Sequence, residues 1–309
     1  MRERNFVYLT LLFGLIWSCK PASREQIETD FKIERPERIA FIEIYHQGKL
    51  EHSLSKTPEG WKLNQKYKVR PDAMDNILRI LPDLKVLYYP PATAWENMVR
   101  AIQEEGVRMV FKEASGKKIK SFSIGGTTND ERGTYAILEG ASKPYVVHVP
   151  GFNGSLVNRF RMSDDEWRDR MIFNEKKEDL VKFRIQYPGE PLSGFELTKK
   201  ENRWVLNNLN HEVIRANESL MSSYLDGFSG IGAEGIENDY RYIPQVLQST
   251  PHAIIEWTTL DGSSRTIKFY PVELDGQTGI ERFYVYDGED FFLAQTRILQ
   301  KIFRSIDSF

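Results

Sequence analysis

The sequence predicts an α+β fold: two similar domains from an internal duplication, each with a mainly antiparallel sheet and about two helices. Short strand-like runs follow one another through turns, which is typical of antiparallel sheets. A turn followed by Trp and, two positions later, Leu occurs around Trp61 and again around Trp204. Each Trp stands behind two predicted strands and ahead of a predicted helix. The two lie 143 residues apart, so we expect them to be core anchors of two repeats.

The composition agrees with a packed globular body and excludes several protein classes. Of the 309 residues, 40% are hydrophobic and 28% are charged, which is enough apolar material for a core and argues against general disorder. A chain of this length suggests about two domains. The formal net charge of −2 provides no basic surface, so we expect no nucleic-acid partner. Aromatic residues make up 12% of the chain, and they favour strands.

Residues 1–19 have the features of a bacterial lipoprotein signal. Two arginines precede an apolar run, residues 6–17, which is shorter than the roughly 20 residues of a membrane-spanning helix. The only cysteine, Cys19, follows an aliphatic, an aromatic and a small residue, and this order resembles a lipobox. The alternative is an ordinary cleaved signal with an incidental cysteine. Residues 20–30 are polar and are predicted to form a tether.

Residues 31–150 are predicted to form the first repeat domain. One helix opens at Pro71 and carries its apolar residues at helical spacing. A second helix follows the capping-box spacing of Thr93 to Glu96 and ends at Gly106. Turns are expected at several glycines, including Gly125-Gly126. The predicted strands cover 38–45, 50–55, 61–63, 84–89, 107–112, 119–125, 134–139 and 144–149.

Residues 151–178 are predicted to bridge to a second repeat domain at residues 179–309. The bridge contains another capping box, Ser163 to Glu166, and so a short helix is expected there. In the second domain the second helix is expected to be short or kinked because of Pro244. A terminal amphipathic helix is expected over 296–303. The predicted strands cover 181–187, 195–200, 204–207, 252–258, 266–271, 282–286 and 290–293.

Several of these segments together resemble a known family. They are the meander with Gly60-Trp61, the Arg70-Pro71-Asp72 helix start, the stretch from Ile124-Gly125 to Gly133-Thr134-Tyr135, and Trp167-Arg168-Asp169-Arg170. This combination is similar to the domain of unknown function 4340 family of bacterial envelope lipoproteins. The resemblance implies an extracytoplasmic envelope setting, near transport or gliding-type membrane components. It implies no reaction and supplies no catalytic residues.

The cluster of Trp167, Arg168, Asp169 and Arg170 is the candidate interaction site of the sequence. An indole flanked by guanidiniums and a carboxylate is typical of an interface hot spot. Its place between the two predicted domains favours the alternative of an interdomain clamp, with the indole packed between the halves and Asp169 pairing with an arginine. Tyr88-Tyr89-Pro90-Pro91 could bind a glycan or peptide, although a strand end explains it equally well.

The sequence favours a non-catalytic role. Its five histidines have no partner at metal-ligand spacing, and no hydrolase or phosphate-loop motif occurs. We therefore expect no enzyme, no cofactor and no metal. The expected function is a binding or scaffold subunit, tethered to a membrane through lipid on Cys19, that serves an envelope protein complex, possibly an ABC transporter or a gliding-type assembly. A glycan- or peptidoglycan-binding module is the first alternative and an unrecognised hydrolase the second.

Overall fold

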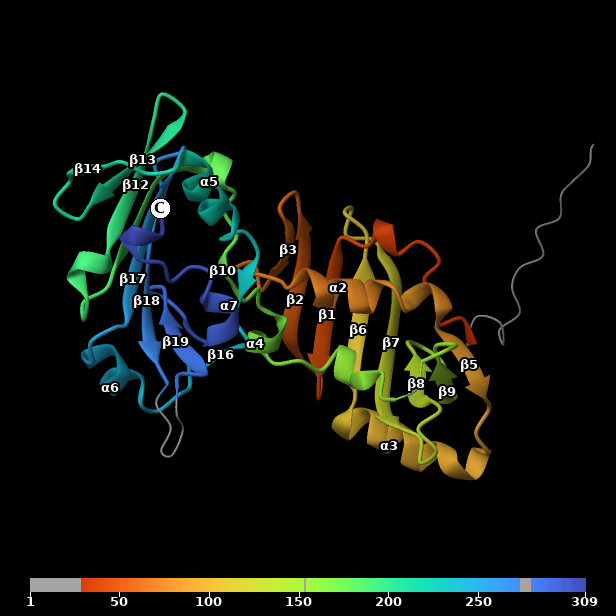
Figure 1. Ribbon diagram of the computed structural model, residues 1–309. Coiled ribbons are helices and arrows are strands. Elements are labelled where there is room, and N and C mark those ends of the chain that lie inside the picture. The colour runs from red at the N-terminus through yellow and green to blue at the C-terminus, as the bar shows by residue number, and fades with distance from the viewer. Residues whose placement is uncertain (1–28, 153, 273–278) are drawn as a thin grey trace, which may run out of the picture.

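The computed structural model describes residues 29–152, 154–272 and 279–309. These residues form two lobes that lie side by side, each built on one nine-stranded sheet (Figure 1). The first sheet contains β1 (Phe41–His46), β2 (Lys49–Thr57), β3 (Gly60–Leu63), β4 (Tyr67–Lys68), β5 (Lys85–Tyr88), β6 (Val107–Lys112), β7 (Lys118–Thr127), β8 (Thr134–Leu138) and β9 (Tyr145–His148). The second contains β11 (Leu180–Gln186), β12 (Phe195–Lys200), β13 (Arg203–Asn208), β14 (Val213–Ile214), β16 (Gly235–Ile236), β17 (Ala253–Thr259), β18 (Ser264–Pro271), β19 (Arg282–Tyr286) and β20 (Phe291–Gln295).

The two sheets have the same strand order. The first runs β4-β3-β2-β1-β6-β7-β8-β9-β5, and the second runs β14-β13-β12-β11-β17-β18-β19-β20-β16. Neighbouring strands pair antiparallel, for example in the central pairs β1–β6 and β11–β17. The predicted α+β fold is therefore confirmed, and the matching sheets are consistent with two similar domains.

Trp61 and Trp204 occupy equivalent positions in the two sheets. Trp61 on β3 pairs with Lys56, and Trp204 on β13 pairs with Lys199. Each indole is 9% exposed and belongs to the core of its own lobe. Because side chains two residues apart on a strand share a face, each indole points to the same side as the buried leucine that follows it.

One helix packs against the core face of each sheet. In the first lobe this is α2 (Pro71–Leu78), which starts at the predicted proline and buries Met74 and Ile77. In the second lobe it is α5 (Glu218–Asp226), which buries Met221 and Leu225. In both lobes, then, a helix at the same place in the order of elements buries apolar side chains in the core.

The second helix of each repeat differs between the lobes. In the first lobe α3 (Trp95–Glu105) packs on the sheet through Ile102, beside Gly125 on β7. A Cβ atom at Gly125 would lie 2.8 Å from Ile102 Cγ1 and 3.1 Å from its Cα, so glycine permits the close approach. The turn predicted at Gly125-Gly126 is wrong, because both residues lie inside β7.

The position of Gly125 is occupied by a tyrosine in the second lobe. Ile124 pairs with Val107, and Phe269 pairs with Ala253 at the same place in the second sheet. The next residue, Tyr270, is 2% exposed. The corresponding helix, α6 (Ile243–Gln248), has only 6 residues and buries none of them, as Pro244 led us to expect.

Two local predictions at helix ends are wrong. Thr93 does not cap α3, because a 3₁₀ turn over Ala92–Ala94 leads into the helix and its N-cap, Ala94, has no side-chain cap. The terminal helix α7 (Thr296–Leu299) stops four residues before the predicted end at Phe303. By contrast, Ser163 does form the predicted capping box with Glu166 at the start of α4 (Asp164–Trp167).

One aromatic residue near the end of each lobe also occupies a matching place: Trp167 in the first lobe and Phe309 in the second. Arg70 N–H donates to Trp167 O over 2.9 Å, and Asn217 N–H donates to Phe309 O over 3.2 Å. Arg70 and Asn217 are the N-cap residues of α2 and α5. The Trp167 ring lies 6.2 Å from His52, and the Phe309 ring lies 4.9 Å from Phe195, measured between ring centroids. Since His52 and Phe195 hold the same register in β2 and β12, Phe309 is the counterpart of Trp167.

Candidate functional site

The bridging segment crosses from one lobe to the other within three residues. Trp167 is fully buried in the first core, and Asp169 N–H donates to Lys68 O on the edge strand β4 over 2.7 Å. From Met171 onward the chain forms β10 (Met171–Phe173), which pairs with β15 (Ile231–Gly232) of the second lobe. Residues 168–170 therefore form a short connection that is hydrogen-bonded at both ends.

Arg168 joins the two lobes at this connection. Its guanidinium carbon lies 3.7 Å from the centre of the Tyr67 ring in the first lobe. Its Nη2 atom donates to Asp290 Oδ2 in the second lobe, and the two side chains are 7% and 13% exposed. Burial disfavours the charge of Arg168, but the hydrogen bond and the charge of Asp290 outweigh burial and raise the pKa of Arg168 above its ordinary value.

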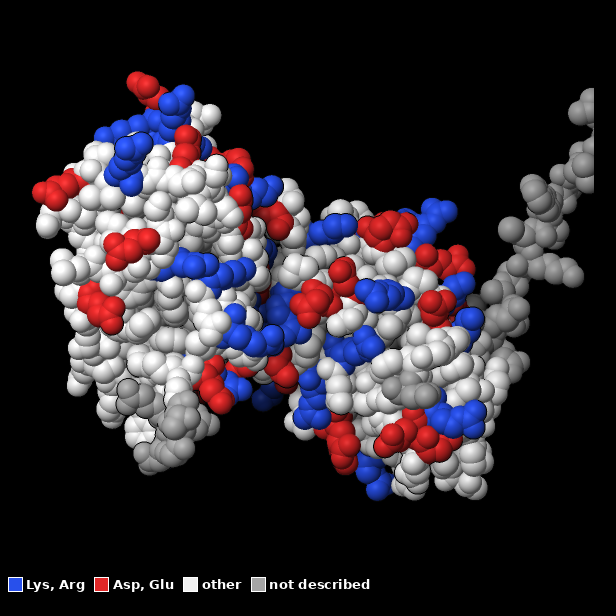
Figure 2. Space-filling model, viewed as in Figure 1, with Lys and Arg blue, Asp and Glu red and all other residues white. Residues whose placement is uncertain are grey.

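Further ion pairs flank Arg168. Asp169 pairs with Lys68 over 2.8 Å within the first lobe, and Lys66 reaches Glu289 across the junction over 3.2 Å. Arg170 donates to the main-chain carbonyl of Glu234 in the second lobe. Figure 2 shows basic and acidic side chains gathered along the boundary between the lobes. The Lys66–Glu289 pair is well exposed, so solvent screens it and it contributes little to stability.

The candidate cluster is thus divided between three roles. Trp167 belongs to the core of the first lobe and does not lie between the halves. Asp169 pairs with a lysine rather than with the expected arginine. Arg168 and Arg170 make the contacts across the junction. Sequence analysis missed Tyr67 and Asp290, because both lie in segments far from the bridge and neither carries a pattern that points to it.

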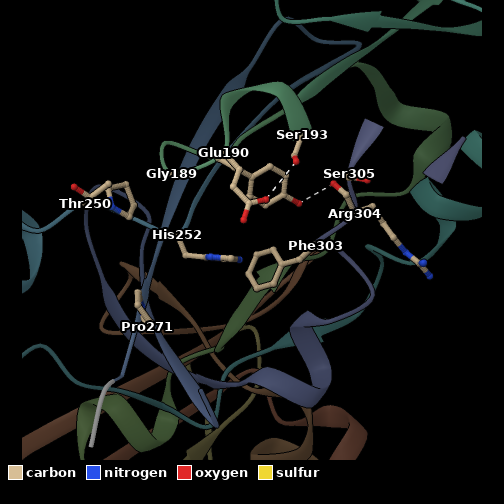
Figure 3. A pocket seen from close by; sticks show the side chains of 11 residues that line it. Gly189, Glu190, Ser193, Thr250, His252, Pro271, Phe303, Arg304 and Ser305 are labelled. Atoms are coloured by element: carbon tan, nitrogen blue, oxygen red, sulfur yellow. Dashed lines mark hydrogen bonds between the residues drawn. The ribbon is translucent and has the colours of Figure 1, made fainter. Parts of the chain in front are cut away.

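A cavity of about 480 Å³ lies at one corner of the second lobe. Its walls come from four separate segments: Tyr187 and Glu190 after β11, His252 before β17, Pro271 at the end of β18, and Phe303 after α7. The His252 ring centroid lies 5.7 Å from Tyr187 and 4.9 Å from Phe303. In the view of Figure 3 the carboxylate of Glu190 lies above the rings of His252 and Phe303.

Burial affects the protonation of two polar side chains in this cavity. Tyr187 donates its hydroxyl proton to Arg304 O over 2.8 Å, and burial raises the pKa of Tyr187, so its ring stays neutral. Burial lowers the pKa of His252, although the charge of Glu190 acts in the opposite direction. The imidazole is therefore neutral at pH 7. Glu190 stays exposed to solvent beside it.

The same corner of the first lobe also holds a cavity, of about 500 Å³, but its lining differs and includes Gln47, Gly106 and Arg108. His46 takes the place of Tyr187, and its Nδ1 atom lies 3.0 Å from Gly106 O at the end of α3. Arg161 donates to Glu105 O over 3.1 Å, and Gln47 donates to Glu104 O over 3.3 Å. The last carbonyl groups of α3 have no partner within the helix, and these polar side chains bind them. In the second lobe α6 is shorter, and aromatic side chains line this corner instead.

Other residues of interest in the sequence lie elsewhere. Tyr88 and Tyr89 are exposed at the end of β5. Asp164 and Asp165 lie in the first turn of α4, where acidic residues favour the helix dipole. Cys19 lies outside the described residues. Within the described ranges, no helix has the length and apolar character needed to span a membrane.

Comparison with known proteins gives one family match. Residues 98–245 match the model of a family described as Domain of unknown function (DUF4340). No curated protein and no solved structure gives a significant match. The matched segment starts within α3 of the first lobe and ends within α6 of the second. It is about as long as one repeat, but it covers part of each lobe and includes the junction. The resemblance to domain of unknown function 4340 is therefore confirmed for residues 98–245 of this chain.

Proposed function

We propose that this protein is a non-catalytic binding or scaffold subunit of a bacterial envelope complex, tethered to a membrane through lipid on Cys19. The observation that carries the proposal is the junction between the lobes. Arg168 is held from the first lobe by Tyr67 and from the second by Asp290. Domains of one chain move relative to each other unless their interface prevents it. This junction favours a body that presents its surfaces at a fixed spacing.

The place where the chain enters the first lobe supports different roles for the two lobes. The first described residues enter the first lobe on the side away from the second lobe (Figure 1). Asp30 is held there by Lys120, whose Nζ atom lies 2.8 Å from Asp30 Oδ2. A chain anchored at Cys19 would keep the first lobe near the membrane, and the second lobe would face an envelope partner such as a transporter or gliding-type component.

The anchor is tested by Cys19→Ser. We expect the variant to leave the membrane fraction, or to remain as an unprocessed precursor, because the lipid-accepting thiol is gone. Labelling cells with radioactive fatty acid checks the outcome. Equal incorporation into the wild-type protein and the variant would contradict lipidation at Cys19.

The scaffold role is tested by a detergent pull-down of the tagged lipoprotein with mass spectrometry of the co-purifying proteins. We expect an envelope protein whose recovery falls in Asp290→Asn, because this change weakens the contact that fixes the lobes. Glu289→Gln is the matched control, since it removes only the exposed pair with Lys66. Unchanged recovery with Asp290→Asn would show that partner binding does not need the fixed arrangement.

A further inference from the structure

We propose that the cavity at the corner of the second lobe binds an organic ammonium group, in which the positive nitrogen lies against the aromatic rings and next to Glu190. The proposal concerns a ligand site of the second lobe. It does not depend on membrane attachment or on the scaffold role.

The walls of the cavity have the composition that such a ligand requires. Tyr187, His252 and Phe303 present aromatic rings, and a cation is attracted to the negative face of an aromatic ring within about 6 Å of its centre. His252 and Phe303 meet at an interplanar angle of 78°, so their rings form two walls rather than one flat stack. A volume of about 480 Å³ lies within the range of small-molecule sites.

The charge of the cavity selects a cation over an anion. Glu190 provides a carboxylate, which in Figure 3 points toward His252, and Ser193 Oγ donates to it over 3.4 Å. Because burial lowers the pKa of His252, the imidazole adds no positive charge at pH 7. The side chain of Arg304 is exposed and extends away from Glu190 in Figure 3, while its carbonyl is occupied by Tyr187.

The corresponding corner of the first lobe contains different residues. There His46, Gln47 and Arg161 bind the terminal carbonyls of α3. The residue at the position of His252 is Gly106, where a Cβ atom would lie 2.3 Å from Ile102 O. The cavity at this corner of the first lobe, of about 500 Å³, has Arg108 in its lining and no carboxylate among the described residues that line it. The combination of aromatic walls with a carboxylate therefore distinguishes the cavity of the second lobe.

Choline is the probe that tests this site, and 3,3-dimethylbutan-1-ol, its uncharged carbon analogue of equal shape, is the matched control ligand. The full chain is solubilised in a maltoside detergent with ¹³C-labelled histidine, and the ring resonance of each histidine is followed by NMR. We expect choline to shift the His252 resonance while His46, His52, His148 and His211 stay in place. We expect the uncharged analogue to bind at least about fivefold more weakly.

Variants separate the two parts of the site. Glu190→Gln removes the charge from an exposed side chain without changing its shape, and Phe303→Leu removes an aromatic face and keeps an apolar residue. Each should weaken choline binding by about fivefold or more. Glu201→Gln, in an exposed turn of the same lobe, should leave binding unchanged. The proposal is overturned if both ligands bind equally, if Glu190→Gln binds like the wild type, or if choline does not move His252.

Discussion

The two lobes share a sheet order and a core register but differ at the corner where the second helix meets the sheet. In the first lobe an 11-residue helix lies on Gly125 and its carbonyl end is bound by polar side chains. In the second lobe Tyr270 fills the place of that contact and a 6-residue helix stands apart. The two lobes share the parts that bury apolar surface. They differ at a corner whose lining the core does not fix.

The largest expected effect tests whether the two cores are equivalent. Trp61→Ala and Trp204→Ala should each lower the free energy of unfolding by roughly 3–5 kcal/mol, because each removes a buried indole and leaves a cavity. Urea unfolding curves measure both losses. Similar losses would support the equivalence of the two positions. A variant that unfolds at the wild-type urea concentration would show that its indole contributes no core packing.

A smaller effect is expected where the lobes meet. Asp290→Asn removes the charged partner of Arg168 in the second lobe and leaves the guanidinium with Asp165, 3.4 Å away on its own side of the junction. We therefore expect a loss of about 1–3 kcal/mol and a broader distribution of distances between the lobes. Spin labels at exposed positions 117 and 201, read by pulsed electron resonance, report the distribution.

The matched control for this experiment is Glu289→Gln, whose pair with Lys66 is open to solvent. It should leave the distribution as in the wild type. An unchanged distribution in Asp290→Asn as well would mean that Arg168 does not hold the lobes together. The fixed spacing would then have to come from the paired strands β10 and β15.

An effect of similar size is expected at the corner itself. Gly125→Ala should cost about 1–3 kcal/mol, because the added methyl group would press on the backbone of α3 at Ile102. Gly126→Ala is the control, since a Cβ atom there meets nothing within 4 Å. Thermal unfolding of the two variants makes the comparison. Equal melting temperatures would show that α3 can move away from the sheet at no measurable cost.

The sequence predicted the sheets well because strand alternation and turn residues are local signals. The 143-residue spacing between Trp61 and Trp204 also anticipated their shared register. The ends of helices were harder to predict from the sequence. The pattern at Thr93 fits a capping box, but a preceding 3₁₀ turn takes over the helix start. Gly125-Gly126 has the composition of a turn, whereas glycine is needed there for a helix that approaches from another part of the chain.

The candidate site was predictable only in part, for a related reason. Trp167 to Arg170 stood out by composition, but their roles depend on groups distant in sequence. Arg168 meets Asp290, which lies 122 residues further along the chain. The cavity at His252 was not anticipated at all, because it is assembled from four segments that are separate in the sequence.

The buried position of Trp167 has a consequence for the order in which the chain folds. The central strands β1 and β6 join segments that lie far apart in the sequence of the first repeat, and the core is completed only by Trp167, after β9. Such long-range closure is slow compared with local contacts. A chain that leaves the ribosome or a secretion channel from its N-terminus must therefore present most of the first lobe before that lobe can close. During this interval its unpaired strands are exposed to aggregation and to proteases.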